Sequence, residues 1–173
     1  MEGEASPDDL NITLQGNRLK LSMVDGWVKN DGRLRIRLQY NQLSHIRVLA
    51  GAVLESRAVL TADHLEIKGG SGAEVTLEIA AKTLEGAAVE GARVMLNGTV
   101  DMQYASAATG GLYDAARLLG AHTDVKANTG GEAHVYASEY LDAAANTGGR
   151  IRYDGDPEKR FTKTNLAGEI RGF

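Results

Sequence analysis

Glycine recurs at a nearly constant interval along most of this chain. Seven glycines follow a small residue or, once, a glutamate, and successive members of the series are 18 to 21 residues apart. These candidate corner residues are Gly51, Gly72, Gly91, Gly111, Gly131, Gly149 and Gly168. Two repeats are almost literal, because residues 127–131 and 145–149 both read Ala-Asn-Thr-Gly-Gly. A repeat of this length indicates a solenoid, in which each unit packs only on its neighbours.

The segments between these glycines alternate apolar and polar residues with a period of two. Val75, Leu77 and Ile79 show it in one repeat, and Val94 and Leu96 show it in the next. This period is typical of β-strands that bury one face. A leucine-rich repeat would instead need several leucines at fixed offsets, which these units lack. Glycine at each corner allows the positive φ with which one strand turns into the next.

The repeat therefore predicts an all-β chain folded as a right-handed parallel β-helix of about six to seven coils. The right hand follows from the strong preference of parallel crossover connections. A left-handed hexapeptide helix is the alternative, but its six-residue apolar period is not visible. With strands rising 3.3 Å per residue, one repeat gives a coil perimeter of roughly 60 Å, enough to enclose one core.

The N-terminal segment 1–40 lacks the glycine repeat and is expected to have a different role. Residues 1–9 are polar and predicted to be a disordered tail, whereas residues 10–173 are predicted to form a single β-helix domain. Within that domain, residues 10–40 are expected to supply N-terminal capping strands, because an uncovered end would expose unpaired backbone groups. The repeats of about 19 residues then occupy residues 41–173.

Three features of the capping segment support this interpretation. Gln15-Gly16-Asn17 separates two alternating segments, which is typical of a hairpin. The segment 34–40 alternates as a further strand would. Trp27, the only tryptophan, is expected to pack within the cap rather than to bind a ligand.

Composition excludes several classes of protein and site. The chain has no cysteine, and therefore no disulfide, thiol nucleophile or cysteine-bound metal. No apolar segment approaches the roughly 18 residues that a membrane-spanning helix needs. A net charge of −4 argues against nucleic acid as a partner, because proteins that bind it usually carry a basic patch.

The titratable residues show no metal-binding motif. Of the four histidines, at positions 45, 64, 122 and 134, only the first two have a spacing that could stack them on adjacent coils. Metal binding by His45 and His64 is therefore the one alternative to our prediction that the chain holds no metal and no cofactor.

The carboxylates show no catalytic motif either. Glycoside hydrolysis needs two carboxyl groups about 5–9.5 Å apart, and the candidate pairs are Glu74 with Glu78 and Asp114 with Glu132. Solvated strand faces explain both pairs equally well. We therefore assign no catalytic residue and predict that the chain is not an enzyme.

Two other sets of side chains recur with the repeat. Asparagine stands three residues before three of the glycines, and stacked amides at equivalent corners can hydrogen-bond to one another. We predict that Asn128, Asn146 and Asn165 form such a structural ladder. Tyrosines could form an exposed stripe suited to carbohydrate, although the two-residue period places some of them inside: Tyr104, Tyr113, Tyr136, Tyr140 and Tyr153.

Several segments together resemble the head GIN domain family, whose members are described as auto-transporter adhesins. They are Ser71-Gly72-Ala73-Glu74-Val75, Glu90-Gly91-Ala92-Arg93-Val94 and the closing segment 148–157, which contains a tyrosine-x-Gly-x-Pro stretch. The resemblance also includes residues 16–21, and it spans roughly residues 10–173. The family supplies no catalytic residues that could be transferred to this chain.

The resemblance implies a right-handed β-helix that is secreted or surface-exposed in a Gram-negative bacterium. We expect a non-enzymatic structural and adhesion module at the cell surface or in the periplasm, with a surface protein or glycan as its partner. A carbohydrate-binding or polysaccharide-processing β-helix is the alternative. Self-association through coil ends or flat faces is a further expectation. The chain begins without a signal peptide, so we expect its N-terminus to be shortened.

Overall fold

The computed structural model describes residues 10–24 and 34–173, and in these ranges it contains strands but no helix. It follows that no helix in the described chain could cross a membrane. The chain divides into two compact units, Met1–Asn41 and Gln42–Phe173.

The first unit contains an antiparallel hairpin. Strand β1 (Leu10–Gln15) pairs with β2 (Arg18–Met23), and the register closes with Gln15 opposite Arg18. Gly16 has a φ of +57° in the connecting turn, as tight hairpin turns require. The hairpin predicted around Gln15-Gly16-Asn17 is confirmed.

The rest of this unit differs from the prediction. The segment 34–40 forms no strand, and Arg35 makes only an isolated bridge. Alternation alone gives a segment two faces, but a strand also needs a neighbour that pairs with its backbone over several residues. Trp27 lies outside the described residues, so its packing, like the capping role of residues 10–40, stays a prediction.

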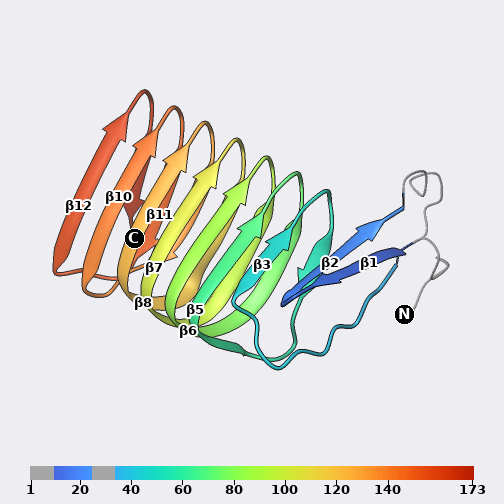
Figure 1. Ribbon diagram of the computed structural model, residues 1–173. Coiled ribbons are helices and arrows are strands. Elements are labelled where there is room, and N and C mark those ends of the chain that lie inside the picture. The colour runs from blue at the N-terminus through green and yellow to red at the C-terminus, as the bar shows by residue number, and fades with distance from the viewer. Residues whose placement is uncertain (1–9, 25–33) are drawn as a thin grey trace. The chain divides into compact units, whose positions relative to one another are not determined.

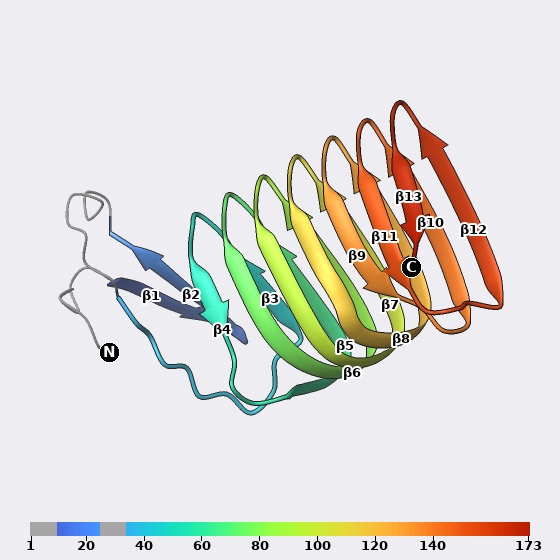
Figure 2. The ribbon, with the colours of Figure 1, turned by 180° about the vertical axis from the view of Figure 1, so that it is seen from behind.

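The second unit is a parallel β-helix of about seven turns (Figure 1, Figure 2). Its strands are β3 (His45–Val48), β4 (Val53–Glu55), β5 (Leu60–Gly69), β6 (Glu74–Val89), β7 (Arg93–Ala108), β8 (Leu112–Asn128), β9 (Glu132–Tyr136), β10 (Tyr140–Asn146), β11 (Arg150–Asp154), β12 (Lys159–Asn165) and β13 (Glu169–Gly172). Every pairing among them is parallel. The predicted parallel β-helix is confirmed.

The strands form two extended faces joined by a bend. One, which we call the β11 face, consists of β4, the first halves of β6, β7 and β8, and then β9, β11 and β13. The other, the β10 face, consists of β3, β5, the second halves of β6, β7 and β8, and then β10 and β12. The long strands β6, β7 and β8 run through the bend from one face to the other (Figure 1).

Register follows the sequence repeat and places one apolar column above the next. Val75 pairs with Val94, and Val94 pairs with Tyr113, so equivalent residues of successive repeats are neighbours. All three side chains are fully buried, as the two-residue period predicted. The residues on either side of them point outward; most are polar, and Met95 and Leu112 are apolar. The core of the second unit is therefore a stack of inward-facing columns enclosed by a single wound sheet.

Each corner contains two consecutive residues in the left-handed conformation. The pairs have φ values between +44° and +73°. They are Ala50-Gly51, Ser71-Gly72, Glu90-Gly91, Thr109-Gly110, Thr129-Gly130, Thr147-Gly148 and Leu166-Ala167. Gly51, Gly72 and Gly91 thus have the conformation that was expected of a corner glycine.

The other four predicted corner glycines stand one residue beyond the left-handed pair. They are needed for a different reason, because a Cβ atom on any of them would lie 2.1 to 2.4 Å from the backbone of an alanine one coil earlier. These positions are Gly111, Gly131, Gly149 and Gly168. Their role is close backbone approach rather than positive φ.

Replacement of a corner threonine by asparagine is expected to stabilise the protein. Thr129 has a φ of +48°, a conformation that is unfavourable for β-branched residues and better tolerated by asparagine. We expect Thr129→Asn to raise the free energy of unfolding by about 1 kcal/mol, measured by urea denaturation. The control, Thr76→Asn in the exposed part of strand β6, should give no gain, since strands favour β-branched residues. Equal effects of the two substitutions would contradict the strain argument.

Candidate functional site

The histidines do not form a metal site. His45 lies opposite Glu66 in the register and His64 lies opposite Thr83, so the two imidazoles are not stacked on one column. The register thus does not support the His45–His64 metal pair that the spacing had left open as an alternative, because His45 pairs with residue 66 and not with residue 64. Within residues 10–24 and 34–173, no three His, Asp or Glu side chains gather as metal ligands would.

Each of the other two histidines lies beside a carboxylate. His122 Nε2 is 3.6 Å from Glu139 Oε2. His134 Nε2 is 3.2 Å from Asp154 Oδ2 without making a hydrogen bond. Both imidazoles are partly exposed, so these contacts are surface electrostatics of modest strength.

The two carboxylate pairs considered for glycoside hydrolysis differ in arrangement, and Asp114 and Glu132 lie on the adjacent strands β8 and β9. Glu74 and Glu78 point outward from the same strand four residues apart, so about 13 Å separates their Cα atoms. Glu132 accepts a hydrogen bond from Arg150 at 2.7 Å. Asp114 accepts one from the backbone N–H of Ala116 at 3.3 Å. Asp114 and Glu132 are both half-buried, and each is engaged by a local partner.

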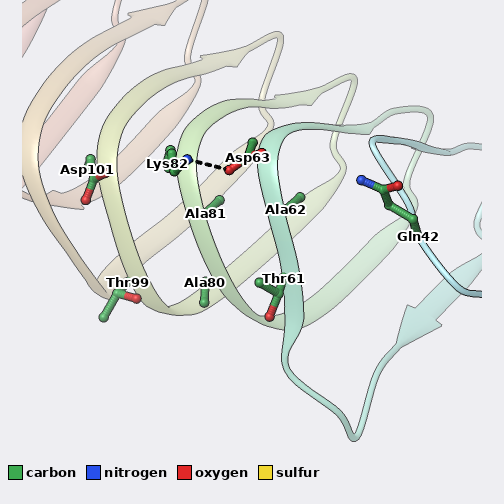
Figure 3. A pocket seen from close by; sticks show the side chains of 9 residues that line it. All are labelled: Gln42, Thr61, Ala62, Asp63, Ala80, Ala81, Lys82, Thr99 and Asp101. Carbon is green, nitrogen blue, oxygen red and sulfur yellow. Dashed lines mark ion pairs between the residues drawn. The ribbon is translucent and has the colours of Figure 1, made fainter.

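A shallow hollow of about 450 Å³ lies on the bend of the coil (Figure 3). Lys82 Nζ is 2.8 Å from Asp63 Oδ1, and Figure 3 shows Asp101 on the other side of Lys82. The hydrogen bond from Lys82 lowers the pKa of Asp63, and the same contact raises the pKa of Lys82. Gln42, Thr61 and Thr99 complete the polar lining. Because Lys82 and Asp63 are paired with each other and the hollow is open to solvent, it offers little to fix a ligand.

The three asparagines of the predicted ladder are joined by side-chain hydrogen bonds. Asn146 Nδ2 donates to Asn128 Oδ1 at 3.0 Å, and Asn165 Nδ2 donates to Asn146 Oδ1 at 2.9 Å. These residues are the last of strands β8, β10 and β12. Each stands two positions before the second left-handed residue of its corner, which is Gly130, Gly148 or Ala167. The amides therefore tie three successive coils together along the β10 face.

Breaking the ladder in its middle is expected to cost more than breaking it at its end. Asn146→Ala removes two amide hydrogen bonds, whereas Asn165→Ala removes one. At about 1 kcal/mol per bond, we expect losses in the free energy of unfolding of about 2 and about 1 kcal/mol. Urea denaturation of both variants measures the difference. A larger effect at Asn165 would argue against the ladder.

Exposed aromatic and methionine side chains gather on the β10 face. Tyr140 on β10 lies between two rings, with ring centres 6.2 Å from His122 and 5.8 Å from Phe161. Tyr104 donates a hydrogen bond to the sulfur of Met102 at 2.8 Å. Tyr104 is 45% exposed and Phe161 is 57% exposed. We call these five residues, Met102, Tyr104, His122, Tyr140 and Phe161, the aromatic patch.

Only part of the tyrosine set considered from the sequence contributes to this patch. Tyr104 and Tyr140 belong to it, whereas Tyr113 and Tyr153 are buried in the core. Tyr136 lies on β9, which belongs to the β11 face. Sequence reasoning missed Met102, His122 and Phe161 as members of the patch. The signal was available for His122, which occupies the place equivalent to Tyr140 in the preceding repeat.

Comparison with known proteins agrees with the fold. The family model described as "Putative auto-transporter adhesin, head GIN domain" matches residues 2–157. A search of curated proteins finds no match. A solved structure of a "putative adhesin" from Bacteroides fragilis has a TM-score of 0.78 and 21% identity, and the match covers 96% of this chain and 77% of that one.

Two structures from Parabacteroides distasonis are also similar, and each match covers 96% of this chain and 79% of the other. One is described as a "putative adhesin", with a TM-score of 0.74 and 15% identity. The other is described as a "putative lipid binding protein", with a TM-score of 0.63 and 19% identity. At these identities the likeness concerns the fold. The family model, in contrast, covers most of the sequence, and the chain belongs to the head GIN domain family of auto-transporter adhesins.

Proposed function

We propose that this chain is a non-enzymatic adhesion module that acts outside the cytoplasm, at the cell surface or in the periplasm. The observation that carries the proposal is the aromatic patch, a cluster of aromatic and methionine side chains on the outer surface of the β10 face, of which Met102, Tyr104 and Phe161 are exposed apolar residues. Exposed apolar clusters on soluble proteins commonly mark interaction sites. Family membership and the adhesin descriptions of two similar structures support the same reading.

The mechanism would be display on a rigid support. Hydrogen-bonded coils and the asparagine ladder hold the patch side chains in a fixed arrangement, so little conformational freedom is lost on binding. One such patch is small, and its affinity for any partner is expected to be weak. Many copies on one surface would raise the overall strength of attachment by multivalency.

A bead assay tests the adhesion function. Beads coated densely with the protein should stay attached to mucin-coated glass or to epithelial cell monolayers under flow, while sparsely coated beads should detach. Albumin-coated beads and beads carrying the chain unfolded by heat are the controls. Retention no better than that of albumin on both surfaces would contradict the proposed function.

The proposed location has its own test. The full gene product, tagged at its C-terminus, should be degraded when intact bacteria are treated with protease, or should be released with the periplasmic fraction. Recovery of the tagged protein only with the cytoplasmic fraction would overturn this part of the proposal.

A further inference from the structure

The aromatic patch borders a pair of aspartates that the register brings side by side. Tyr104 pairs with Asp124, Asp124 with Asp142, and Asp142 with Phe161, so that the four side chains form one row across β7, β8, β10 and β12. A second row, two residues earlier on the same strands, contains the rest of the patch. Two carboxylates thus lie between aromatic rings on one outward-facing surface.

The carboxylates have unused hydrogen-bonding capacity. Among the described residues, the side chain of Asp142 takes part in no hydrogen bond or ion pair, and the one ion pair of Asp124 is with Lys126 at 3.6 Å. Neighbouring strands lie about 4.8 Å apart, and like charges directly opposite each other are unfavourable. Hydroxyl groups that donated to both carboxylates would stabilise this arrangement.

A row of lysines runs beside the row of aspartates. Ala144 pairs with Lys126 on one side and with Lys163 on the other, two residues beyond the aspartate row. A third lysine, Lys159, pairs with Tyr140. Glu85 pairs with Tyr104 and continues the aspartate row, so the three lysines face four carboxylates when the nearby Glu139 is included. The surface is therefore close to balanced in charge and has little net charge to attract a charged partner.

The rings are placed to contact a flat apolar surface. Tyr140 is tilted by 44° from both His122 and Phe161, so the rings are not stacked face to face and part of each face stays open. Aromatic rings supply a large apolar contact area at a low cost in conformational entropy. A sugar ring has an apolar C–H face, which can pack on the aromatic rings. Its hydroxyls both donate and accept hydrogen bonds, and so can bind the aspartates as acceptors and the lysines as donors.

We infer that the aromatic patch and the adjoining Asp124 and Asp142 bind a neutral oligosaccharide. The rings pack on the C–H faces of the sugar units, the two carboxylates accept from their hydroxyls, and the lysine row donates to them. The inference rests on the proposed adhesion function and names the chemical class of its partner. The charge balance disfavours an acidic glycan or a basic polypeptide as the main ligand.

A glycan array with the multivalent protein provides the first test. Neutral oligosaccharides should bind above background, while sialylated and sulfated glycans and a polylysine peptide should bind less. Titration of the best neutral glycan should then give a threefold to tenfold weaker affinity for Tyr140→Ala and for Asp142→Asn, roughly one aromatic contact or one hydrogen bond each.

Tyr136→Ala is the matched control, because Tyr136 is a partly exposed tyrosine on the other face. Its affinity should stay within about twofold, and thermal unfolding should show that all three variants are folded. Absence of neutral glycan binding, preference for polylysine, or equal effects of Tyr136→Ala and Tyr140→Ala would each overturn the inference. Bead attachment that persists without glycan binding would overturn the inference alone, whereas loss of all bead attachment would contradict the proposed function itself.

Discussion

Gly149→Ala is expected to lower the free energy of unfolding by about 3 kcal/mol, one of the largest effects of a single methyl group in this chain. The added Cβ would lie 2.2 Å from the carbonyl oxygen and 2.5 Å from the carbonyl carbon of Ala127. Neither atom can move freely, since both belong to the backbone of strand β8. The corner would have to separate from the coil below it. Urea denaturation measures the loss, and a fall in Tm of several degrees should accompany it.

The adjacent glycine provides the control. Gly148 has a φ of +71°, and a Cβ atom there would meet nothing within 4 Å. Gly148→Ala should therefore cost only the left-handed penalty of about 1–2 kcal/mol, and Gly148→Asn should recover part of it. At position 149, asparagine should destabilise the protein more than alanine, because the larger side chain clashes more with the backbone of Ala127. An asparagine that improves position 149, or equal losses for the two alanines, would contradict this division of roles.

The terminal coil offers a further variant in case Gly149→Ala does not fold. Gly168 has the same kind of contact, with an added Cβ 2.1 Å from the carbonyl oxygen of Ala145. It precedes β13 in the last coil, which can open without disturbing the coils before it. Gly168→Ala should therefore destabilise less than Gly149→Ala and should increase hydrogen exchange in β12 and β13. Undisturbed exchange there would show that the contact is not needed.

The coil could be predicted from the sequence because the interval between its glycines matches the length of one coil. The individual roles of the glycines could not be predicted in this way. In Thr147-Gly148-Gly149 either glycine can be assigned to the positive φ, and both choices give similar intervals to the next repeat. The last corner has no glycine at its left-handed positions, which are Leu166 and Ala167. Spacing therefore predicted the number of corners, whereas the exact position within each corner depends on backbone contacts between coils.

The candidate site was less accessible to sequence reasoning than the fold. Alternation predicts which side chains face outward, so the exposed Tyr104 and the buried Tyr113 could in principle be separated. The neighbours of a side chain on the next coil depend on repeat lengths that vary from 18 to 21 residues. Phe161 pairs with Asp142 in the register, and Tyr140 pairs with His122, although the two pairs differ in their separation along the chain. Only the observed register brings these residues into one patch.

The largest fully buried side chain, that of Tyr113, depends on a glycine that has no role in a corner. Tyr113 is fully buried, and it follows Val94 in the same inward column. A Cβ on Gly86 would lie 2.4 Å from its hydroxyl oxygen and from its Cε2 atom. The hydroxyl accepts a hydrogen bond from Gln103 at 2.8 Å, and burial raises the pKa of Tyr113. The hydroxyl end of the ring thus accepts a hydrogen bond from Gln103 and occupies space that a side chain at Gly86 would need.

This arrangement predicts strong coupling between Gly86 and Tyr113. Gly86→Ala should lower the free energy of unfolding by about 2–3 kcal/mol through overpacking. Tyr113→Leu should lower it by about 2–4 kcal/mol, because it leaves a cavity and removes the partner of the buried Gln103 amide. In the double variant the alanine methyl enters space that the ring has left. The double variant should therefore lose less free energy of unfolding than the two single variants together, by at least about 1 kcal/mol.

A double-mutant cycle measured by urea denaturation tests the coupling, with Gly120→Ala as the control for adding a methyl group to a buried strand glycine. The atoms nearest to a Cβ on Gly120 are 3.4 Å away or further, so this variant should lose less than about 1 kcal/mol. Strictly additive losses at Gly86 and Tyr113 would mean that the ring can move aside. In a coil enclosed by hydrogen-bonded strands, the ring has no such freedom. We therefore expect that Tyr113 fits in the core only because residue 86 is a glycine.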